Sequence, residues 1–185
     1  AAAAMAATPA KATVKKNTAV SIAIPEDYKW IETEETNVVM LVAKHYVAQN
    51  GSKKYETLEE AVASANDGDA IVLLKNCSGN GIVVPQGKFT TGLTIDFGRF
   101  TYDFSGNGVG STGTEYNGFQ LLMNNKVTFK NGTLVATSED AGFLIQNYSD
   151  LTLDNMVIDG TGVWGGYVLS NNNGTTVIKD PTITA

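Results

Sequence analysis

A repeat of 24 residues in the C-terminal half of the chain is the feature that most restricts its fold. Three segments begin alike at intervals of 24 positions, at Gly118-Phe119, Gly142-Phe143 and Gly166-Tyr167. Hydrophobic residues alternate within a segment, as in Val127-Thr128-Phe129, which is the period of a strand with one buried face. Short strands that recur at such an interval stack as coils, so the sequence predicts a β-solenoid and excludes a helical repeat.

The repeat also predicts which residues lie side by side on neighbouring coils. Hydrophobic and threonine positions meet in three columns: Val127, Leu151 and Thr175; Phe129, Leu153 and Val177; Leu134, Ile158 and Thr182. A further column is aromatic and contains Phe119, Phe143 and Tyr167. We expect this aromatic column to belong to the core, and not to form a platform for sugars.

Acidic residues are distributed through this register without being paired. Lys126 is expected to face Asp150, and Lys130 to face Asp154, and no column holds two acids. The paired carboxylates of a glycosidase and the oxygen cluster of a calcium site are therefore not predicted. His45 is the only histidine, which excludes a multi-histidine zinc site. We expect no catalytic residue, no metal ligand and no cofactor.

Several features precede the repeat. The segment Thr57-Leu58-Glu59-Glu60 has the pattern of a capping box, so a helix is expected at about 57–67. Gly68, in the turn Asp67-Gly68-Asp69, is expected to end this helix, which would cap the first coil. The segment 93–100 resembles 127–134 at an offset of 34, and the ten extra residues are expected to loop out between Ser105 and Asn117.

These patterns divide the chain into three parts. Residues 1–10 form a linker or tag-like segment, and 11–50 a small β-rich connector that includes strand-like residues 14–24. Residues 51–185 form the solenoid, without a polar segment that could cap its last coil. We expect that open C-terminal end to be covered by further modules of the same chain or by a partner chain.

Composition narrows the classes of partner. The net charge is −6, and Arg99 is the only arginine, which disfavours binding to nucleic acid or to an anionic membrane. No run approaches the roughly 18 apolar residues of a membrane-spanning helix. Cys77 is the only cysteine, so an internal disulfide is excluded and a small buried residue is expected there.

The candidate ligand-binding residues are aromatic and amide side chains. Trp164 lies in the glycine-rich turn Gly162-Val163-Trp164-Gly165-Gly166, and it could pack or bind. Tyr148 and Asn172, which align at the 24-residue spacing, could contact sugar hydroxyls. The alternative for the asparagines, which we favour, is a structural role as stacked amides at the corners of the coils.

Three segments resemble the opening of pectate-lyase-like parallel β-helix modules, namely Tyr46–Gln49, Tyr55–Val62 and Asp67–Leu74. The later coils are similar to those of large repetitive surface proteins of bacteria. The resemblance implies a right-handed parallel β-helix on the bacterial cell surface, with a structural or adhesive role and a glycan or host-surface ligand. It also leaves open a carbohydrate-active lyase or hydrolase fragment and a phage fibre or tailspike module, because the same fold hosts all of these.

Overall fold

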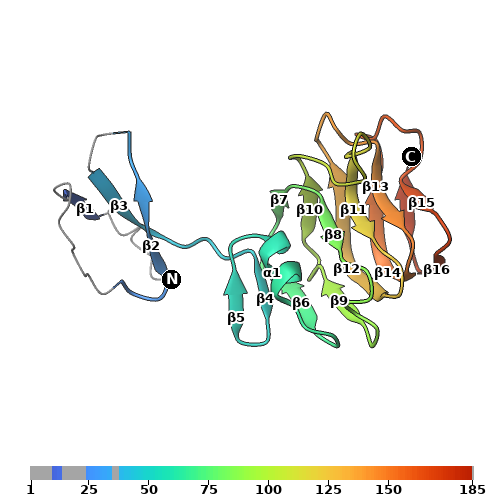
Figure 1. Cartoon of the computed structure of the whole chain (residues 1–185), viewed down its shortest axis with the longest axis horizontal. Coiled ribbons are helices and arrows are strands. Elements are labelled where there is room, and N and C mark those ends of the chain that lie inside the picture. Colours follow the sequence, from blue (N-terminus) through green and yellow to red (C-terminus); the bar gives the residue numbers. More distant parts are fainter. Residues whose placement is uncertain (1–9, 14–23, 35–37, 185) are drawn as a thin grey trace. The chain divides into compact units, whose positions relative to one another are not determined.

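The computed structural model describes residues 10–13, 24–34 and 38–184, and it divides the chain into two compact units, 1–45 and 46–185 (Figure 1). This division falls five residues before the predicted end of the connector at residue 50. Nearly all of the linker or tag-like segment 1–10 and of the strand-like segment 14–24 lies outside the described residues.

The first unit is a three-stranded antiparallel sheet with the strand order β1-β3-β2. The strands are β1 (Ala10–Thr13), β2 (Tyr28–Glu32) and β3 (Val38–Ala43). The side chain of Thr33 donates to the carbonyl oxygen of Val38 over 3.0 Å, which holds the end of β2 against the start of β3. The described part of this unit is therefore a small antiparallel β sheet.

A hairpin and one helix begin the second unit. The hairpin consists of β4 (Ala48–Asn50) and β5 (Lys53–Tyr55), and β4 pairs antiparallel with the first solenoid strand, β6. Helix α1 (Leu58–Ser64) follows, and the Thr57 side chain accepts from the Glu60 N–H over 3.1 Å, as a capping box requires. Together they cover the N-terminal end of the solenoid (Figure 1).

The predicted end of this helix was wrong. It stops at Ser64 with Ala65 as its C-cap, and Gly68 lies in the next turn with a φ of +93°. Asp69 accounts for the early stop, because its carboxylate accepts from the Asn66 N–H over 2.8 Å and so competes with a further helical turn.

The rest of the unit is a parallel β-helix of about five turns, with a spacing of about 25 residues. Each complete coil contributes to three sheets. The first sheet contains β6 (Ala70–Leu73), β9 (Leu93–Asp96), the start of β12 (Lys126–Ala136), the start of β14 (Asp150–Asp159) and β16 (Thr175–Lys179). The second contains β7 (Cys77–Gly79), β10 (Thr101–Phe104), the ends of β12 and β14, and β17 (Thr182–Thr184). The third contains β8 (Ile82–Val84), β11 (Asn117–Leu121), β13 (Phe143–Asn147) and β15 (Leu169–Asn171).

The predicted register is confirmed on the first sheet between β12 and β14. Val127 pairs with Leu151 at the expected spacing of 24, and Val127 pairs with Leu93 at the expected offset of 34. Of the ten extra residues, six loop out between β10 and β11 as predicted, and two lie at each of the corners 97–100 and 122–125. Lys126 pairs with Asp150 and Lys130 with Asp154, while the Lys130 ammonium lies 3.4 Å from the Asp96 carboxylate on the preceding coil.

The register differs where the corners of the coils differ in length. On the third sheet Phe119 pairs with Ile145, 26 residues on, because the corner 122–125 is two residues longer than the corner 148–149. In the last coil Leu151 pairs with Thr176, not with Thr175, because the corner 172–174 is one residue longer than 148–149. A fixed spacing of 24 residues therefore predicts the wrong residue pairs at both places.

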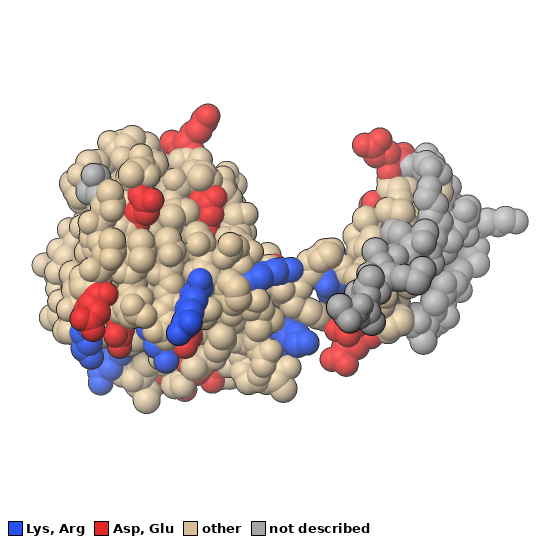
Figure 2. Space-filling model, turned by 180° about the vertical axis from the view of Figure 1, so that it is seen from behind, with Lys and Arg blue, Asp and Glu red and all other residues tan. Residues whose placement is uncertain are grey.

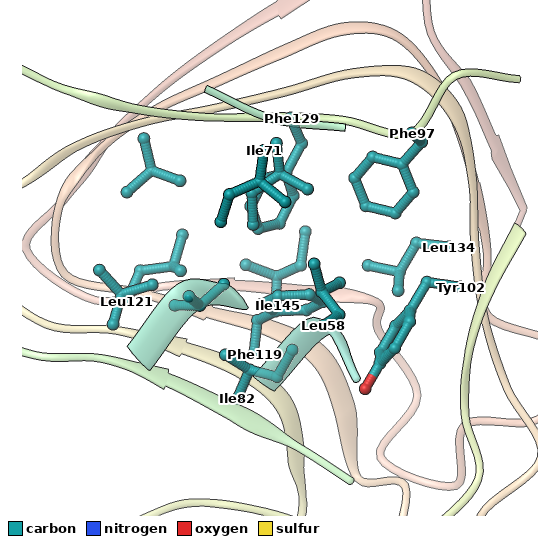
Figure 3. Close-up of a cluster of buried hydrophobic side chains, with 14 of the residues drawn as sticks. Leu58, Ile71, Ile82, Phe97, Tyr102, Phe119, Leu121, Phe129, Leu134 and Ile145 are labelled. Atoms are coloured by element: carbon teal, nitrogen blue, oxygen red, sulfur yellow. The ribbon is translucent and has the colours of Figure 1, made fainter. Parts of the chain in front are cut away.

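The core consists of residues that point inward from all three sheets (Figure 3). Aromatic rings occupy its middle. Phe129 lies 4.8 Å from Phe119 and 5.8 Å from Phe97 between ring centroids, and Tyr102 meets Phe119 at 5.8 Å. Burial of each such ring contributes about 1.5 to 3 kcal/mol to the stability of the fold, so these four rings stabilise the stacking of successive coils.

Amide side chains stabilise the corners, as the structural interpretation predicts. Asn131 and Asn155 adopt left-handed backbone conformations between the first and second sheets, with φ of +58° and +53°. The Asn155 Nδ2 donates to the Asn131 Oδ1 over 3.2 Å along the solenoid axis. At the corner between the third and first sheets, the Asn147 Nδ2 donates to the Asn171 Oδ1 over 2.8 Å.

Candidate functional site

Three loops meet at the corner between the second and third sheets. They comprise residues 105–116 after β10, 137–142 after β12 and 160–168 after β14, and they come from successive coils. In Figure 1 these loops lie along the upper rim of the solenoid. Loops carried on a rigid scaffold are common sites of binding, so the loops of this rim form the candidate functional site.

Three aromatic rings from these loops and one from the start of β13 form one contiguous cluster, which we call the ring cluster: Tyr116, Trp164, Tyr167 and Phe143. Tyr116 lies in the centre, 5.3 Å from Trp164 and 5.8 Å from Phe143 between ring centroids. Phe143 in turn lies 4.8 Å from Tyr167. Trp164 is 63% exposed and Tyr167 is 51% exposed, so the two outer rings present a large aromatic surface to solvent.

The backbone holds these rings in place. The carbonyl oxygen of Tyr116 accepts from the N–H groups of Gly142 and Phe143, at 2.8 and 3.2 Å. The Trp164 N–H donates to the carbonyl oxygen of Ala141 over 3.0 Å. A Cβ on Gly142 would lie 2.5 Å from the Tyr116 ring and 3.2 Å from the Trp164 ring, so the pair can pack only because residue 142 is glycine.

The ring cluster corrects the prediction of a buried aromatic column. Phe119 is fully buried and pairs with Ile145, as part of the core. Phe143 pairs with Asn117, is only half-buried, and contacts the exposed Tyr167. Two of the three column residues therefore lie at the surface, because the two-residue shift on the third sheet moves Phe143 out of line with Phe119.

The three predicted ligand-binding residues do not lie together. Tyr148 and Asn172 are at the corner between the third and first sheets, where the Asn172 Nδ2 donates to the Tyr148 hydroxyl oxygen over 3.5 Å. Tyr148 lines a shallow groove of about 340 Å³ there, with Lys126 and Asp150. Trp164 belongs to the ring cluster at a different corner. Sequence reasoning found Trp164 but missed Tyr116, Phe143 and Tyr167 as its neighbours.

The side-chain amide of Asn125, which lines that groove, has a structural role. Asn125 is buried, its Oδ1 accepts from the Phe89 N–H over 2.8 Å, and its Nδ2 donates to the carbonyl oxygens of Pro85 and Leu122. Ser149 stacks on Asn125, since the Asp150 N–H donates to the Asn125 carbonyl oxygen over 3.0 Å. Gly174 follows in this column, and not Asn173, which the 24-residue spacing would align with Ser149, because Thr175 pairs with Asp150.

The acidic turn after α1 is engaged in hydrogen bonds. The Asp67 carboxylate accepts from the N–H groups of Thr91 and Gly92, and these bonds, chiefly that of Gly92, lower the pKa of Asp67 to about 2. Asp69 accepts from the Asn50 amide over 2.6 Å. Within the described ranges, no group of three or more His, Cys, Asp and Glu side chains could hold a metal ion.

Cys77 lies on the second sheet and is half-buried. Burial raises the pKa of the Cys77 thiol to about 11, so the thiol stays protonated at neutral pH. This environment is that of a packing residue, in agreement with the sequence.

No protein-family model, curated protein or solved structure matches this chain, so the resemblance to pectate-lyase-like modules stays a prediction. Among the described residues, no helix has both the length and the apolar character needed to cross a bilayer.

Proposed function

We propose that this chain is a non-enzymatic, extracellular structural or adhesive module of a bacterial surface protein, and that the ring cluster contacts glycans. The observation that carries the proposal is the ring cluster itself. Tyr116 and Phe143 fix the positions of two rings that remain exposed, Trp164 and Tyr167, on a rigid parallel β-helix. The resemblance of the coils to bacterial surface proteins supports the extracellular location.

The physical argument concerns what an exposed indole can bind. Large aromatic rings lose little conformational entropy on binding and offer both apolar surface and, for Trp and Tyr, a polar group. A pyranose ring has an apolar face of C–H groups and an edge of hydroxyls, which matches that combination. Because the outer rings rest on the inner ones, their positions are set before the ligand arrives, which lowers the cost of binding.

A glycan array followed by titration calorimetry tests this proposal. The intact chain is expected to bind at least one class of glycan without forming a product. Trp164→Ala should weaken that binding at least about tenfold, because tryptophan is enriched among the few residues that carry most of the energy of an interface. Tyr148→Ala is the matched control, since Tyr148 is an aromatic residue at a different corner, and it should bind as the wild type does.

Four results would contradict the proposal. Binding to no glycan would remove the evidence for the site. If Tyr148→Ala lost binding while Trp164→Ala kept it, the ring cluster would not be the binding site. Release of oligosaccharides would instead favour a carbohydrate-active enzyme. Threefold assembly in solution would favour a phage fibre or tailspike module.

Hydrophobic residues at core positions are exposed in the last described coil, and they support a second proposal, that a partner chain covers this coil. Ile178 pairs with Leu153 and Ile183 with Ile158. Their partners on the preceding coil are each 1% exposed, whereas Ile178 is 43% exposed and Ile183 is 42% exposed. If this surface binds another chain, sedimentation should show concentration-dependent association that Ile178→Lys abolishes, and a monomer at all concentrations would count against it.

A further inference from the structure

We infer that the ring cluster selects glycans that carry protonated amino groups, such as hexosamines with a free amine, and rejects uronates and other acidic sugars. This inference rests on the proposed glycan-binding function and adds the charge of the ligand. It follows from the distribution of charged side chains around the rings, which differs sharply from that of the first sheet.

Two of the three loops at this corner contain acidic residues, and none of the three contains a basic one. Glu115 precedes Tyr116, and Glu139 and Asp140 precede Phe143 by only a few residues. All three carboxylate-bearing residues are exposed. Loops 105–116, 137–142 and 160–168 contain no lysine or arginine, so the charges that these loops carry are all negative.

Two further carboxylates stand where these loops begin. Asp103 accepts from the N–H and the hydroxyl of Thr137, at 2.9 and 2.7 Å, and so holds the start of loop 137–142. Asp159 accepts from the Thr161 N–H over 3.0 Å at the start of loop 160–168. These carboxylates are fixed by the fold, and they extend the negative field across the corner that carries the rings.

The basic residues of the same coils lie on the first sheet or at the corner between the first and second sheets. They are Lys126 and Lys130 in β12, Lys179 in β16, and Arg99 at the corner before β10, while residues 131–178 contain none. Figure 2 shows this division on one face, where the upper part of the solenoid carries only acidic charge. A uronate at the ring cluster would therefore be repelled without any cation to pair with it.

Rings and carboxylates together favour a cation. A protonated amine close to the face of Trp or Tyr is attracted by the ring quadrupole, and nearby carboxylates add to that attraction. A buried acceptor lies in the same region. Asn117 follows Tyr116, pairs with Phe143, and its Oδ1 atom is buried without a hydrogen-bond partner among the described residues. Because Asn117 is fully buried, this oxygen is not accessible to a ligand on the ring surface, and the charge selection rests on the rings and the carboxylates.

The test compares three oligosaccharides of equal length by titration calorimetry with the intact chain. Oligomers of glucosamine, of N-acetylglucosamine and of galacturonate carry positive, zero and negative charge at the pH of the assay. We expect the glucosamine oligomer to bind about tenfold more tightly than the N-acetylated one, and the galacturonate oligomer not to bind. Raising the salt concentration to about 0.5 M should reduce the preference, because exposed charges are then screened.

Two double variants separate a local effect from the net charge of the protein. Glu139→Gln with Asp140→Asn removes two charges from the loops and should lower the preference for glucosamine about threefold. Asp150→Asn with Asp154→Asn removes the same number from the first sheet and should leave the preference unchanged. Equal effects of the two double variants would overturn the inference, since the preference would then reflect only the total charge.

The remaining outcomes distinguish the inference from the function on which it rests. Equal binding of the neutral and cationic oligomers, or tighter binding of galacturonate, overturns the charge selection but leaves glycan binding intact. Binding of none of the three, with a clear signal from an oligolysine peptide, overturns the inference and makes the cluster a site for basic protein segments. Binding of nothing on an array or in the titrations overturns both.

Discussion

Replacing Asn147 by alanine should destabilise the solenoid by about 3 kcal/mol. Asn147 is fully buried at the corner between the third and first sheets. Its Nδ2 donates to the Asn171 Oδ1 over 2.8 Å and to the Thr175 carbonyl oxygen over 3.0 Å, and its Oδ1 accepts from the Ser149 N–H over 2.9 Å. One side chain thus joins three points on two coils.

The magnitude depends on what happens to these partners after the substitution. Asn171 and Thr175 are exposed, so water can replace the lost bonds, at a net cost of about 1 kcal/mol for each. Ser149 is buried, and its N–H would be left without a partner, at about 1 to 3 kcal/mol. Together these costs amount to about 3 to 5 kcal/mol, and relaxation of the corner brings the expected destabilisation to about 3 kcal/mol.

Urea unfolding followed by far-ultraviolet circular dichroism measures this change. The midpoint should fall with little change in the slope, because the folded coil buries the same surface. Asn172→Ala is the control, since Asn172 is an exposed neighbour whose bond to Tyr148 is 3.5 Å long, and its effect should be below about 0.5 kcal/mol. Equal stabilities of the two variants would refute the role assigned to Asn147.

Three other experiments have defined outcomes. Gly142→Ala should displace the Tyr116 and Trp164 rings and alter tryptophan fluorescence, because the new Cβ would lie 2.5 Å from Tyr116; an unchanged spectrum would contradict this packing. The Asp67 pKa is lowered from 3.8 to about 2, so its charged form stabilises the fold above about pH 4, and this contribution is lost as the pH falls toward 2; Asp67→Asn should remove that part of the acid sensitivity in a pH titration of stability. Because burial raises the pKa of Cys77 to about 11, the thiol should react with Ellman's reagent at pH 8 much more slowly in the folded chain than in urea, and equal rates would disprove its protection.

Local sequence patterns predict the coils because a strand with one buried face needs alternation whatever its neighbours are. Val127-Thr128-Phe129 and Leu151-Thr152-Leu153 therefore align correctly by sequence alone. The helix start is equally local, since Thr57 caps it through its own side chain. Its end depends on Asp69, whose competing bond to the Asn66 N–H is not visible in the hydrophobic pattern.

The register at the third sheet was not predictable from a fixed spacing. Corners absorb insertions without disturbing the sheets, so one corner of four residues and another of two shift Phe119 against Phe143 while Lys126 and Asp150 stay aligned. The ring cluster follows from that shift and from three loops that meet only in the folded solenoid. The available signal was that aromatic residues lie in glycine-rich segments after the second-sheet strand of two coils, as Tyr116 does after β10 and Trp164 does after β14.

The most direct test of the central claim is the fluorescence of Trp164 during titration with a glucosamine oligomer. The chain has two tryptophans, and Trp30→Phe leaves Trp164 as the sole emitter. If the ring cluster binds the sugar, its emission should shift and saturate, with a dissociation constant equal to that from calorimetry. Binding detected by calorimetry without any change in the emission of Trp164 would show that the ligand lies elsewhere, and would contradict the account.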